Sequence, residues 1–170
     1  MIITAGIYKG RKMSVPDEKI TRPTLSKVRM GVFNTLYSIL GDFSGLTFLD
    51  LFGGSGLMGL EALSRGFKDV IVCEKNMHAV EIIKKNYSSI GLTPNLVVGD
   101  SLKFIEKETS IYDVVYVDPP YKSGICETII PKLKGKIIIA EHSEPLKISG
   151  LNVIKEKNYG GKYITFLSRD

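Results

Sequence analysis

Residues 46–66 read LTFLDLFGGSGLMGLEALSRG. The apolar residues 46–51 predict a buried strand, and residues 57–65 predict a helix. The glycines between them let the backbone turn sharply and come close to a ligand at the helix N-terminus. This stretch therefore predicts a strand, a tight turn and a helix, with a ligand site in the turn.

Strand-like and helix-like segments continue to alternate after this unit. The predicted strands cover residues 46–51, 70–74, 96–99, 114–117 and 136–141. The predicted helices lie near residues 57–65, 77–90, 101–107 and 124–133. Such alternation predicts an α/β fold in which a mostly parallel sheet is wound with right-handed crossovers.

Two more strand-like runs, residues 151–157 and 163–168, follow near the end of the sequence. Asn158-Tyr159-Gly160-Gly161 joins them and is too short for a crossover helix. We therefore expect an antiparallel hairpin at one side of a sheet that has seven strands in all.

The N-terminal region shows a different pattern. Residues 2–14, with Gly6 and Gly10 among them, predict a β-hairpin or a curled strand pair. After a break at residues 22–24, apolar residues spaced three and four apart predict a helix that runs to about residue 40. These apolar residues are Leu25, Val28, Val32, Leu36 and Ile39. We expect residues 1–170 to form one domain, in which residues 1–45 extend a core of residues 46–170.

Composition limits the class of protein. The chain has 170 residues, 44% hydrophobic and 24% charged, which suits one globular domain. No apolar stretch approaches the roughly 20 residues of a membrane helix, and no signal-peptide layout is present at the N-terminus, so we expect a cytoplasmic protein with no membrane partner. The cysteines Cys73 and Cys126, with His78 and His142, do not form a disulfide framework or a metal-binding pattern, so we expect no metal.

The net charge of +5 is unevenly distributed. Residues 1–45 hold seven basic and three acidic residues, whereas residues 46–170 hold 16 basic and 15 acidic residues. The basic character of the N-terminal extension suits a phosphate-rich partner. On charge alone, a solvated surface that keeps the protein soluble is an equal interpretation.

Residues 112–121 read YDVVYVDPPY and hold the most specific chemistry. The prolines Pro119 and Pro120 stop the predicted strand at Val117. The Asp118 carboxylate and the Pro119 carbonyl are two acceptors that can grip the hydrogens of a nucleobase amine and free its lone pair. Tyr121 can stack on the base, which contributes about 1–3 kcal/mol. The alternative is a strand ended by a Pro-Pro turn with a solvated aspartate.

The glycine turn permits two cofactor classes. Residues 54–59 satisfy the dinucleotide pattern G-x-G-x-x-G, which by itself is a weak indication of NAD. Asp50 argues against NAD, because its carboxylate would repel a pyrophosphate but attract the amino group or sulfonium of S-adenosylmethionine. Glu74, at the end of the second strand, can hold ribose hydroxyls of either cofactor. Asp100 can accept from an adenine amine or cap the helix at residues 101–107.

Taken in order, these elements resemble the S-adenosylmethionine-dependent methyltransferases with an Asp/Asn-Pro-Pro-Tyr/Phe motif. Within that class the chain most resembles the RsmD family of bacterial 16S rRNA guanine-N2 methyltransferases. The resemblance rests on residues 6–12, 22–24, 28–29, 33–34, 50–56, 59–66, 118–121 and 159–160. It departs from the family at Gly53, where alanine is commoner, at Gly161-Lys162, where Asp-Thr is expected, and in a shorter C-terminal half.

The resemblance implies a function and a role for each motif. It implies a Rossmann-like fold that transfers a methyl group from S-adenosylmethionine to a guanine in 16S rRNA or in the small ribosomal subunit, with the protein acting as a monomer. The implied cofactor contacts are Asp50, Phe52, Gly53, Gly54, Ser55 and Gly56 at the methionine end, Glu74 and Lys75 at the ribose, and Asp100 and Ser101 at the adenine. The flipped guanine would be held by Asp118, Pro119, Pro120 and Tyr121. The RNA phosphates would be held by Lys9, Arg11, Lys12, Arg22, Lys27 and Arg29.

Three alternatives remain open. A DNA adenine-N6 methyltransferase uses the same tetrapeptide, but this short chain has little room for a target-recognition region. A protein-glutamine methyltransferase has asparagine where this chain has Asp118. A non-catalytic RNA-binding assembly factor is hard to reconcile with the joint presence of Asp50, Glu74 and Asp118. Glu141 and His142 are a further possible element of the site, although a lone histidine there is more often structural.

Overall fold

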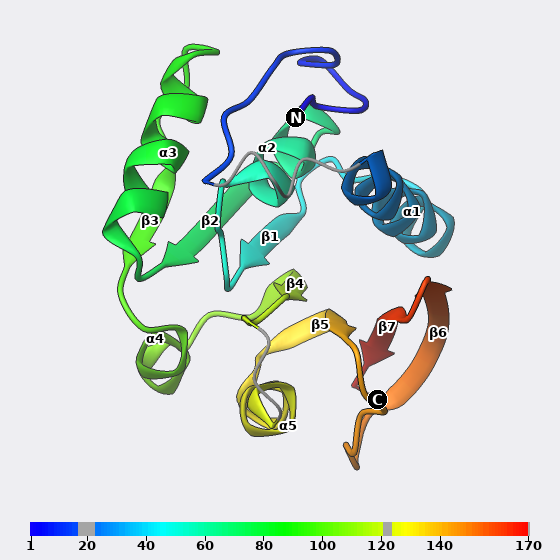
Figure 1. Ribbon diagram of the computed structural model, residues 1–170. Helices are drawn as coiled ribbons and strands as arrows, with labels where there is room; N and C mark the ends of the chain where they lie inside the picture. The colour runs from blue at the N-terminus through cyan, green and yellow to red at the C-terminus, as the bar shows by residue number, and fades with distance from the viewer. Residues whose placement is uncertain (17–22, 121–123, 170) are drawn as a thin grey trace.

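A seven-stranded sheet with helices on both faces forms the body of the protein (Figure 1). The computed structural model describes residues 1–16, 23–120 and 124–169, and the side chains of residues 23–25 are not described. Tyr121 and Arg22, for which the sequence predicts contacts with guanine and RNA, lie outside the described residues.

The elements follow the predicted order. They are α1 (Pro23–Leu40), β1 (Thr47–Asp50), α2 (Leu57–Ser64), β2 (Asp69–Glu74), α3 (Met77–Ser88), β3 (Asn95–Val98), α4 (Ser101–Lys107), β4 (Tyr112–Val117), α5 (Ile125–Ile129), the 3-10 helix η2 (Ile130–Lys132), β5 (Gly135–His142), β6 (Asn152–Tyr159) and β7 (Lys162–Ser168). The helix predicted at 124–133 is divided into α5 and η2, and Pro131, which has no N–H to donate, lies in the first turn of η2.

The strand order is β3-β2-β1-β4-β5-β7-β6. The strands from β3 to β5 are parallel, and β7 runs antiparallel to both of its neighbours. The predicted C-terminal hairpin is therefore confirmed, and it forms one side of the sheet. Residues 143–151, all of them described, connect β5 to β6 without a helix or strand.

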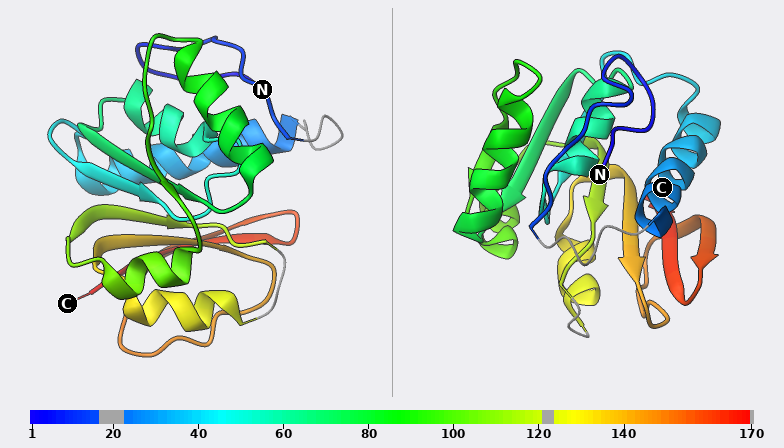
Figure 2. Two further views of the ribbon diagram at one scale, coloured as in Figure 1. Left: turned by 90° about the vertical axis from the view of Figure 1, so that its left-hand side faces the viewer. Right: turned by 45° about the horizontal axis from the view of Figure 1, so that its top comes forward.

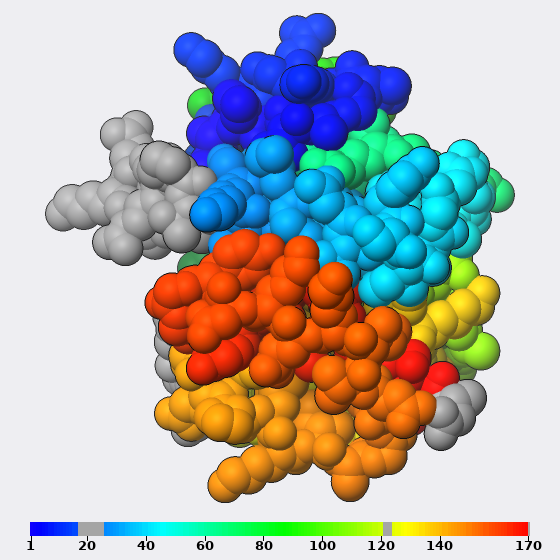
Figure 3. Space-filling model, turned by 90° about the vertical axis from the view of Figure 1, so that its right-hand side faces the viewer, coloured from blue at the N-terminus to red at the C-terminus, as the bar shows by residue number. Residues whose placement is uncertain are grey.

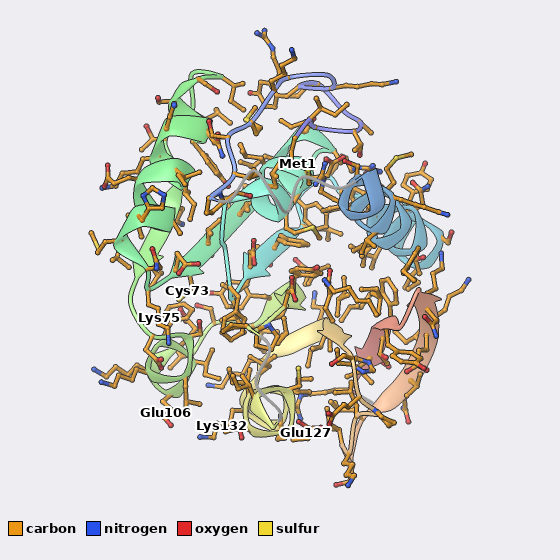
Figure 4. All side chains as sticks on the ribbon, viewed as in Figure 1. Met1, Cys73, Lys75, Glu106, Glu127 and Lys132 are labelled. Carbon is orange, nitrogen blue, oxygen red and sulfur yellow. The ribbon has the colours of Figure 1, made fainter. Side chains whose placement is uncertain are left out.

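Helices cover the two faces of the sheet unequally. The helices α1, α2 and α3 pack on one face, and α4 and α5 pack on the other (Figure 2). Aromatic rings fill the first interface, where Phe33 stacks on Phe48 at 5.8 Å and Phe43 stacks on Phe67 at 4.6 Å. On the second face, Glu106 of α4 and Lys132 of η2 form an ion pair at 3.1 Å (Figure 4).

The N-terminal segment forms the second of the two predicted structures, a short curled strand pair, because the Ile3 N–H donates to the Arg11 carbonyl and the Met13 N–H donates to the Met1 carbonyl. A single antiparallel bridge pairs Ile2 with Lys12, and Gly6 and Gly10 adopt left-handed φ angles of 82° and 83°. The loop between them also bonds to α2, because the Ile7 N–H donates to the Ser64 carbonyl at 2.8 Å. Contact with the end of α2 thus replaces a longer strand ladder.

Glu61 of α2 anchors this N-terminal loop. Its carboxylate is fully buried and accepts from the backbone N–H of Thr4 at 2.9 Å. It also pairs with Arg29 Nε at 3.0 Å and Arg65 Nε at 2.9 Å. Burial opposes ionisation of Glu61, but the bonds from Thr4 and Arg65 and the charge of Arg29 outweigh it and lower its pKa.

Arg29 therefore has a structural role, which corrects the predicted RNA contact. Its side chain is 4% exposed and is held by Glu61 and by the Ile2 carbonyl. A guanidinium that is buried in this way cannot reach a phosphate on another molecule.

Helix α1 also contacts the hairpin of β6 and β7. Figure 3 shows β6 lying directly against α1 on one face of the molecule. Gly31 makes this approach possible, since a Cβ at this position would overlap the Tyr159 hydroxyl and lie 2.9 Å from Tyr159 Cζ. The family motif at Tyr159 thus packs against the N-terminal helix.

Candidate active site

Four acidic side chains meet at the edge of the sheet where the parallel strands end, which we call the carboxyl edge. Asp50 ends β1, Glu74 ends β2, Asp118 follows β4, and Glu141 lies near the end of β5. Ligands of open α/β sheets bind at this edge. The opposite edge, where the strands begin, is called the amino edge.

The glycine turn is held against the end of β2. The Gly53 N–H donates to the Cys73 carbonyl at 2.9 Å, and the Gly54 N–H donates to Glu74 Oε2 at 2.8 Å. Gly56, with φ 76°, leads directly into α2. A side chain at Gly53 would overlap Val72, so in this chain the close approach of the turn to β2 requires glycine.

Asp50 is buried and only partly satisfied. Its side chain is 1% exposed, and Oδ1 accepts from the Phe52 N–H at 3.3 Å. Oδ2 has no hydrogen-bond partner among the described residues. Burial raises the pKa of Asp50 to about 7, and the negative charges of Glu74 and Glu141 act in the same direction. An ammonium group would supply the missing donor and charge, so Asp50 fits the amino group of S-adenosylmethionine.

Glu74 and Ser101 use some of their hydrogen-bonding groups within the protein and leave others for a ligand. Glu74 accepts from the Asn76 N–H at 2.8 Å besides the bond from Gly54, and each oxygen keeps a second lone pair for a ribose hydroxyl. The Ser101 hydroxyl donates to the Leu51 carbonyl. The group of Ser101 that is suited to a purine is its backbone N–H, since the first N–H groups of a helix have no partner within it.

Asp100 and Lys75 complete the predicted cofactor side. Asp100 caps α4 by accepting from the Lys103 N–H at 3.1 Å, which confirms the structural role that the sequence left open. Its carboxylate is exposed, so a contact with adenine stays a prediction. Lys75 is exposed and lies next to Cys73 at the end of β2, between α3 and α4 (Figure 4).

Asp118 lies just beyond β4 on the strand next to Asp50. The pairing of β1 with β4 places Asp50 opposite Tyr116, two residues before Asp118. Asp118 and Pro119 are partly buried, and Pro120 is exposed. Burial and the neighbouring Glu141 carboxylate raise the pKa of Asp118 to about 8, while the charge of Lys162 opposes this increase.

Glu141, which the sequence left as a possible element of the site, is joined by Lys162, which the sequence did not assign. Glu141 is 6% exposed, accepts from the Tyr116 hydroxyl and pairs with Lys162. The position of Glu141 at a predicted strand end was the one available signal. His142 faces the other side of the sheet, where its ring contacts Thr165 Oγ1 and the Glu144 carbonyl at 2.7 Å each.

A cavity lies on the His142 side, away from the four carboxyl groups. Its volume is about 350 Å³, and His142, Leu146, Ile148, Thr165 and Leu167 contribute to its lining. This face is bordered by residues 143–151, the segment without a helix.

The predicted RNA contacts are dispersed over the molecule. Lys9, Arg11 and Lys12 are exposed on the loop that packs against Ser64, at the amino edge. The length of α2, about 12 Å for an eight-residue helix, separates this loop from the glycine turn. Lys27 is exposed on α1. Lys9, next to Tyr8, therefore lies away from the carboxyl edge, and Arg11 and Lys12 lie on the chain that runs from this loop back to Ser14.

The chain then returns toward the glycine turn. Asn86 of α3 accepts from the Ser14 N–H at 2.8 Å and donates to the Ser55 carbonyl at 2.9 Å.

The described residues contain no helix that is both long and apolar enough to cross a membrane. The same residues contain no group of three His, Cys, Asp or Glu side chains arranged to hold a metal ion.

The chain is similar to known proteins over most of its length. The sequence model of a family described as conserved hypothetical protein 95 matches residues 1–168. Ribosomal RNA small subunit methyltransferase D of Escherichia coli strain K12 is 32% identical over 142 residues, covering 83% of this chain and 70% of that protein. YlbH of Bacillus subtilis strain 168 is 30% identical over 176 residues and covers 94% of both chains.

A solved structure extends the likeness to three dimensions. The structure of yhhF from Escherichia coli matches with a TM-score of 0.86 at 27% identity and covers 100% of this chain and 98% of that one. The similarity therefore includes the N-terminal extension as well as the core.

Proposed function

This chain belongs to the RsmD family of methyltransferases, and from that membership we propose that it methylates the N2 amine of a guanine in 16S rRNA, using S-adenosylmethionine. The observation that carries the proposal is the pairing of β1 with β4, which brings Asp50 and Asp118 to the ends of neighbouring strands at the carboxyl edge. A site for the methyl donor thus adjoins a site for the amine.

The residues at the cofactor side fit S-adenosylmethionine. Asp50 would bind the amino group through its unpartnered Oδ2, and Glu74 would bind the ribose hydroxyls. Asp100 and the Ser101 N–H would contact the adenine. When bound, the cofactor supplies an electrophilic methyl group on a sulfonium, so no covalent enzyme intermediate is needed.

On the base side, the work of the protein is orientation. The Asp118 carboxyl and the Pro119 carbonyl would accept the two amine hydrogens and direct the nitrogen lone pair at the methyl carbon. Such positioning can lower a barrier by about 7–11 kcal/mol. Pro120 would fix the turn and Tyr121 would stack on the base, which must leave its own stack or come from a single-stranded loop.

The phosphates around the target would contact basic side chains of the N-terminal extension. We propose Lys27, on α1, and the more distant Lys9, Arg11 and Lys12 for this role, with the small subunit or its 16S rRNA as partner and a monomer in the cytoplasm as the working form. A substrate that touches both edges of the sheet must extend along the protein for at least the length of α2, which suits a folded RNA.

Transfer of labelled methyl groups tests the proposal. Unmodified small subunits, naked 16S rRNA and duplex DNA are offered to the protein, and the products are digested to nucleosides. We expect label in N2-methylguanosine from rRNA or subunits. Label in DNA adenine, or S-adenosylmethionine binding without any transfer, would overturn the proposal in favour of a DNA enzyme or a binding protein.

The matched control is Asp118→Ala. We expect this variant to bind S-adenosylmethionine with unchanged affinity, because Asp118 lies on the base side, and to lose turnover. Full activity of Asp118→Ala would contradict the role of Asp118. It would not change the conclusion on which nucleoside carries the label.

A further inference from the structure

Four polar side chains at the carboxyl edge lie on the face of the sheet that α1 covers. Tyr116 and Asp118 stand two positions apart at the end of β4 and so point to the same side. Glu141 of β5 stands two positions after Ile139, the partner of Tyr116. Lys162 stands two positions before Ile164, the partner of Glu141, at the start of β7.

These side chains form one connected group. The Tyr116 hydroxyl donates to Glu141 Oε1, and Lys162 Nζ pairs with Glu141 Oε2. Asp118 and Glu141 directly follow Val117 and Ala140, which are paired between β4 and β5, so their carboxyl groups lie beside each other. Glu141 is 6% exposed, so the group is shielded from water on the Glu141 side.

The number of protons in this group follows from the bonds. Two ionised carboxylates are both acceptors, so two adjacent carboxyl groups can form a hydrogen bond only if one of them holds a proton. Glu141 already accepts from the Tyr116 hydroxyl and pairs with Lys162, whereas burial and the charge of Glu141 raise the pKa of Asp118 to about 8. The shared proton therefore belongs to Asp118, and Asp118 presents to its ligand a carbonyl oxygen whose orientation is fixed by Glu141.

We propose that Glu141 is a positioning residue that acts through Asp118, holding its hydroxyl and taking its proton during methyl transfer, and that Lys162 keeps Glu141 anionic until then. This inference rests on the proposed function. Protonated Asp118 offers the amine a carbonyl oxygen that accepts as an amide oxygen does. Its hydroxyl can also pass a proton on to Glu141.

Methyl transfer forms one bond, breaks one bond and leaves one proton to be removed from the amine. The amine nitrogen forms a bond to the methyl carbon while the carbon–sulfur bond breaks, and that electron pair stays on sulfur. The nitrogen then carries one proton too many. It passes this proton to the carbonyl oxygen of Asp118, whose hydroxyl proton moves to Glu141. Asp118 ends as it began, and Glu141 later releases its proton to solvent.

Other titratable groups face Asp118 from the neighbouring elements. Burial raises the pKa of Tyr116 on β4 well above its usual value, and burial raises the pKa of Cys126 on α5 to about 11, so both stay neutral near pH 7. Asp50 of β1 is the remaining carboxyl group near Asp118, with a pKa of about 7. Any titration must therefore include variants of Asp50 and of Asp118, so that the signals of the two carboxyl groups can be told apart.

The first test uses ligand-free protein and does not depend on the substrate. Infrared difference spectra, recorded as a function of pH, detect the protonated carboxyl band, and Asp118→Asn and Asp50→Asn assign it. We expect the Asp118 band to titrate at lower pH in Glu141→Gln, which removes a negative neighbour, and at higher pH in Lys162→Met, which removes a positive one. An unchanged titration in Glu141→Gln, or no band lost in Asp118→Asn, would overturn the proposal.

The second test measures methyl transfer. We expect Glu141→Gln to lower kcat by about 100-fold, the scale of a lost proton acceptor, with little change in KM for either substrate. We expect Lys162→Met to move the acidic limb of the kcat profile to higher pH, because the proton acceptor then lacks its paired cation, and Lys162→Arg to restore the limb. Wild-type kcat in Glu141→Gln, or an unmoved limb in Lys162→Met, would contradict the relay.

Two controls separate a relay from a structural effect. Lys155→Met removes an exposed lysine of β6 and should change neither the band nor the pH profile. Circular dichroism and thermal unfolding check each variant, and Lys162→Met provides a second route if Glu141→Gln does not fold. If the wild type methylates no guanine, the proposed function fails in that assay, whereas the infrared result still decides whether Asp118 and Glu141 share a proton.

Discussion

Asp50 shows how one buried carboxyl group can favour a ligand at the expense of the free protein. Its Oδ2 lacks a partner among the described residues, and burial raises its pKa from 3.8 to about 7. A group whose folded-state pKa is raised stabilises the protein at low pH, and this contribution is lost as pH rises toward the folded pKa. The ligand-free protein should therefore lose stability between the unfolded-state pKa of Asp50 and its folded-state pKa of about 7.

Replacing Asp50 with asparagine tests this cost. We expect the free energy of unfolding of Asp50→Asn, relative to wild type, to increase between about pH 4 and about pH 7, by up to about 4 kcal/mol. Urea unfolding across that pH range measures the difference. Calorimetry should show weaker S-adenosylmethionine binding for the same variant, because asparagine cannot neutralise an ammonium group.

Asp113 supplies a control of opposite sign. Burial opposes its ionisation, but Lys136 and Thr47 outweigh it and lower its pKa. A lowered folded-state pKa adds stability above the unfolded pKa, so Asp113→Asn should lose stability relative to wild type as pH rises. If the free energies of unfolding of wild type and Asp50→Asn changed with pH in parallel, Asp50 would not destabilise the ligand-free protein near neutral pH.

Glu61 is the residue on which the N-terminal loop depends. Glu61→Gln leaves the buried Arg29 guanidinium without its carboxylate, and we expect a loss of about 3–5 kcal/mol in the free energy of unfolding. Since the pKa of Glu61 is lowered, the wild type should lose the same stabilisation in acid, as pH falls below the unfolded pKa of glutamate.

Glu106→Gln is the matched control for Glu61. It breaks the ion pair with Lys132, in which both side chains are about half exposed, and we expect a change of about 1 kcal/mol or less. Equal effects of the two substitutions in urea unfolding would show that burial does not decide the contribution of Glu61.

At the scale of elements, α1 and the hairpin of β6 and β7 depend on each other through Gly31. Alanine favours a helix over glycine by about 1 kcal/mol, so Gly31→Ala would stabilise an isolated α1. In this protein the added methyl group meets Tyr159. The tertiary contact and the helix propensity therefore act in opposite directions.

We expect the contact to dominate, so that Gly31→Ala lowers the midpoint of thermal unfolding. A double-mutant cycle with Tyr159→Leu should give a coupling of about 0.5–3 kcal/mol, because the smaller side chain vacates the space. Asn34→Ala, at an exposed position of the same helix, should be nearly neutral or stabilising. A coupling near zero would contradict the proposed packing.

At the scale of the whole molecule, the two edges of the sheet have different roles. The carboxyl edge holds the acidic side chains, and the basic loop with Lys9, Arg11 and Lys12 lies at the amino edge. Any contribution of this loop to RNA binding must come from RNA that reaches beyond the target nucleotide. The loop should therefore affect affinity for large substrates and leave cofactor binding unchanged.

Changing Lys9, Arg11 and Lys12 together to glutamine tests this separation. We expect weaker binding of 16S rRNA and a shallower dependence on salt, by about 0.7–0.9 in the logarithmic slope for each lost phosphate contact. Filter binding at several salt concentrations measures both. The same three changes at Lys103, Lys107 and Lys132, on the opposite face, are the control, and equal slopes for the two triple variants would exclude the loop as a specific RNA contact.

Local sequence patterns predict the alternation of strands and helices, the glycine turn at Gly53 and the acidic strand ends at Asp50, Glu74 and Asp118. These features are local, because strand and helix periodicity and the conformational freedom of glycine act within a few residues. The antiparallel hairpin was equally predictable, since the short connection before Lys162 leaves no length for a crossover.

Which charged side chains are available to a ligand, and which are paired inside the protein, depends on tertiary packing. Arg29 and Lys9 belong to the same basic segment, yet Arg29 is buried against Glu61 while Lys9 is exposed at the amino edge. Glu141 and Lys162 joined Asp118 because adjacent strands bring together residues that are distant in sequence. Charge counts and motifs do not contain that information, since burial and pairing depend on how the whole chain packs.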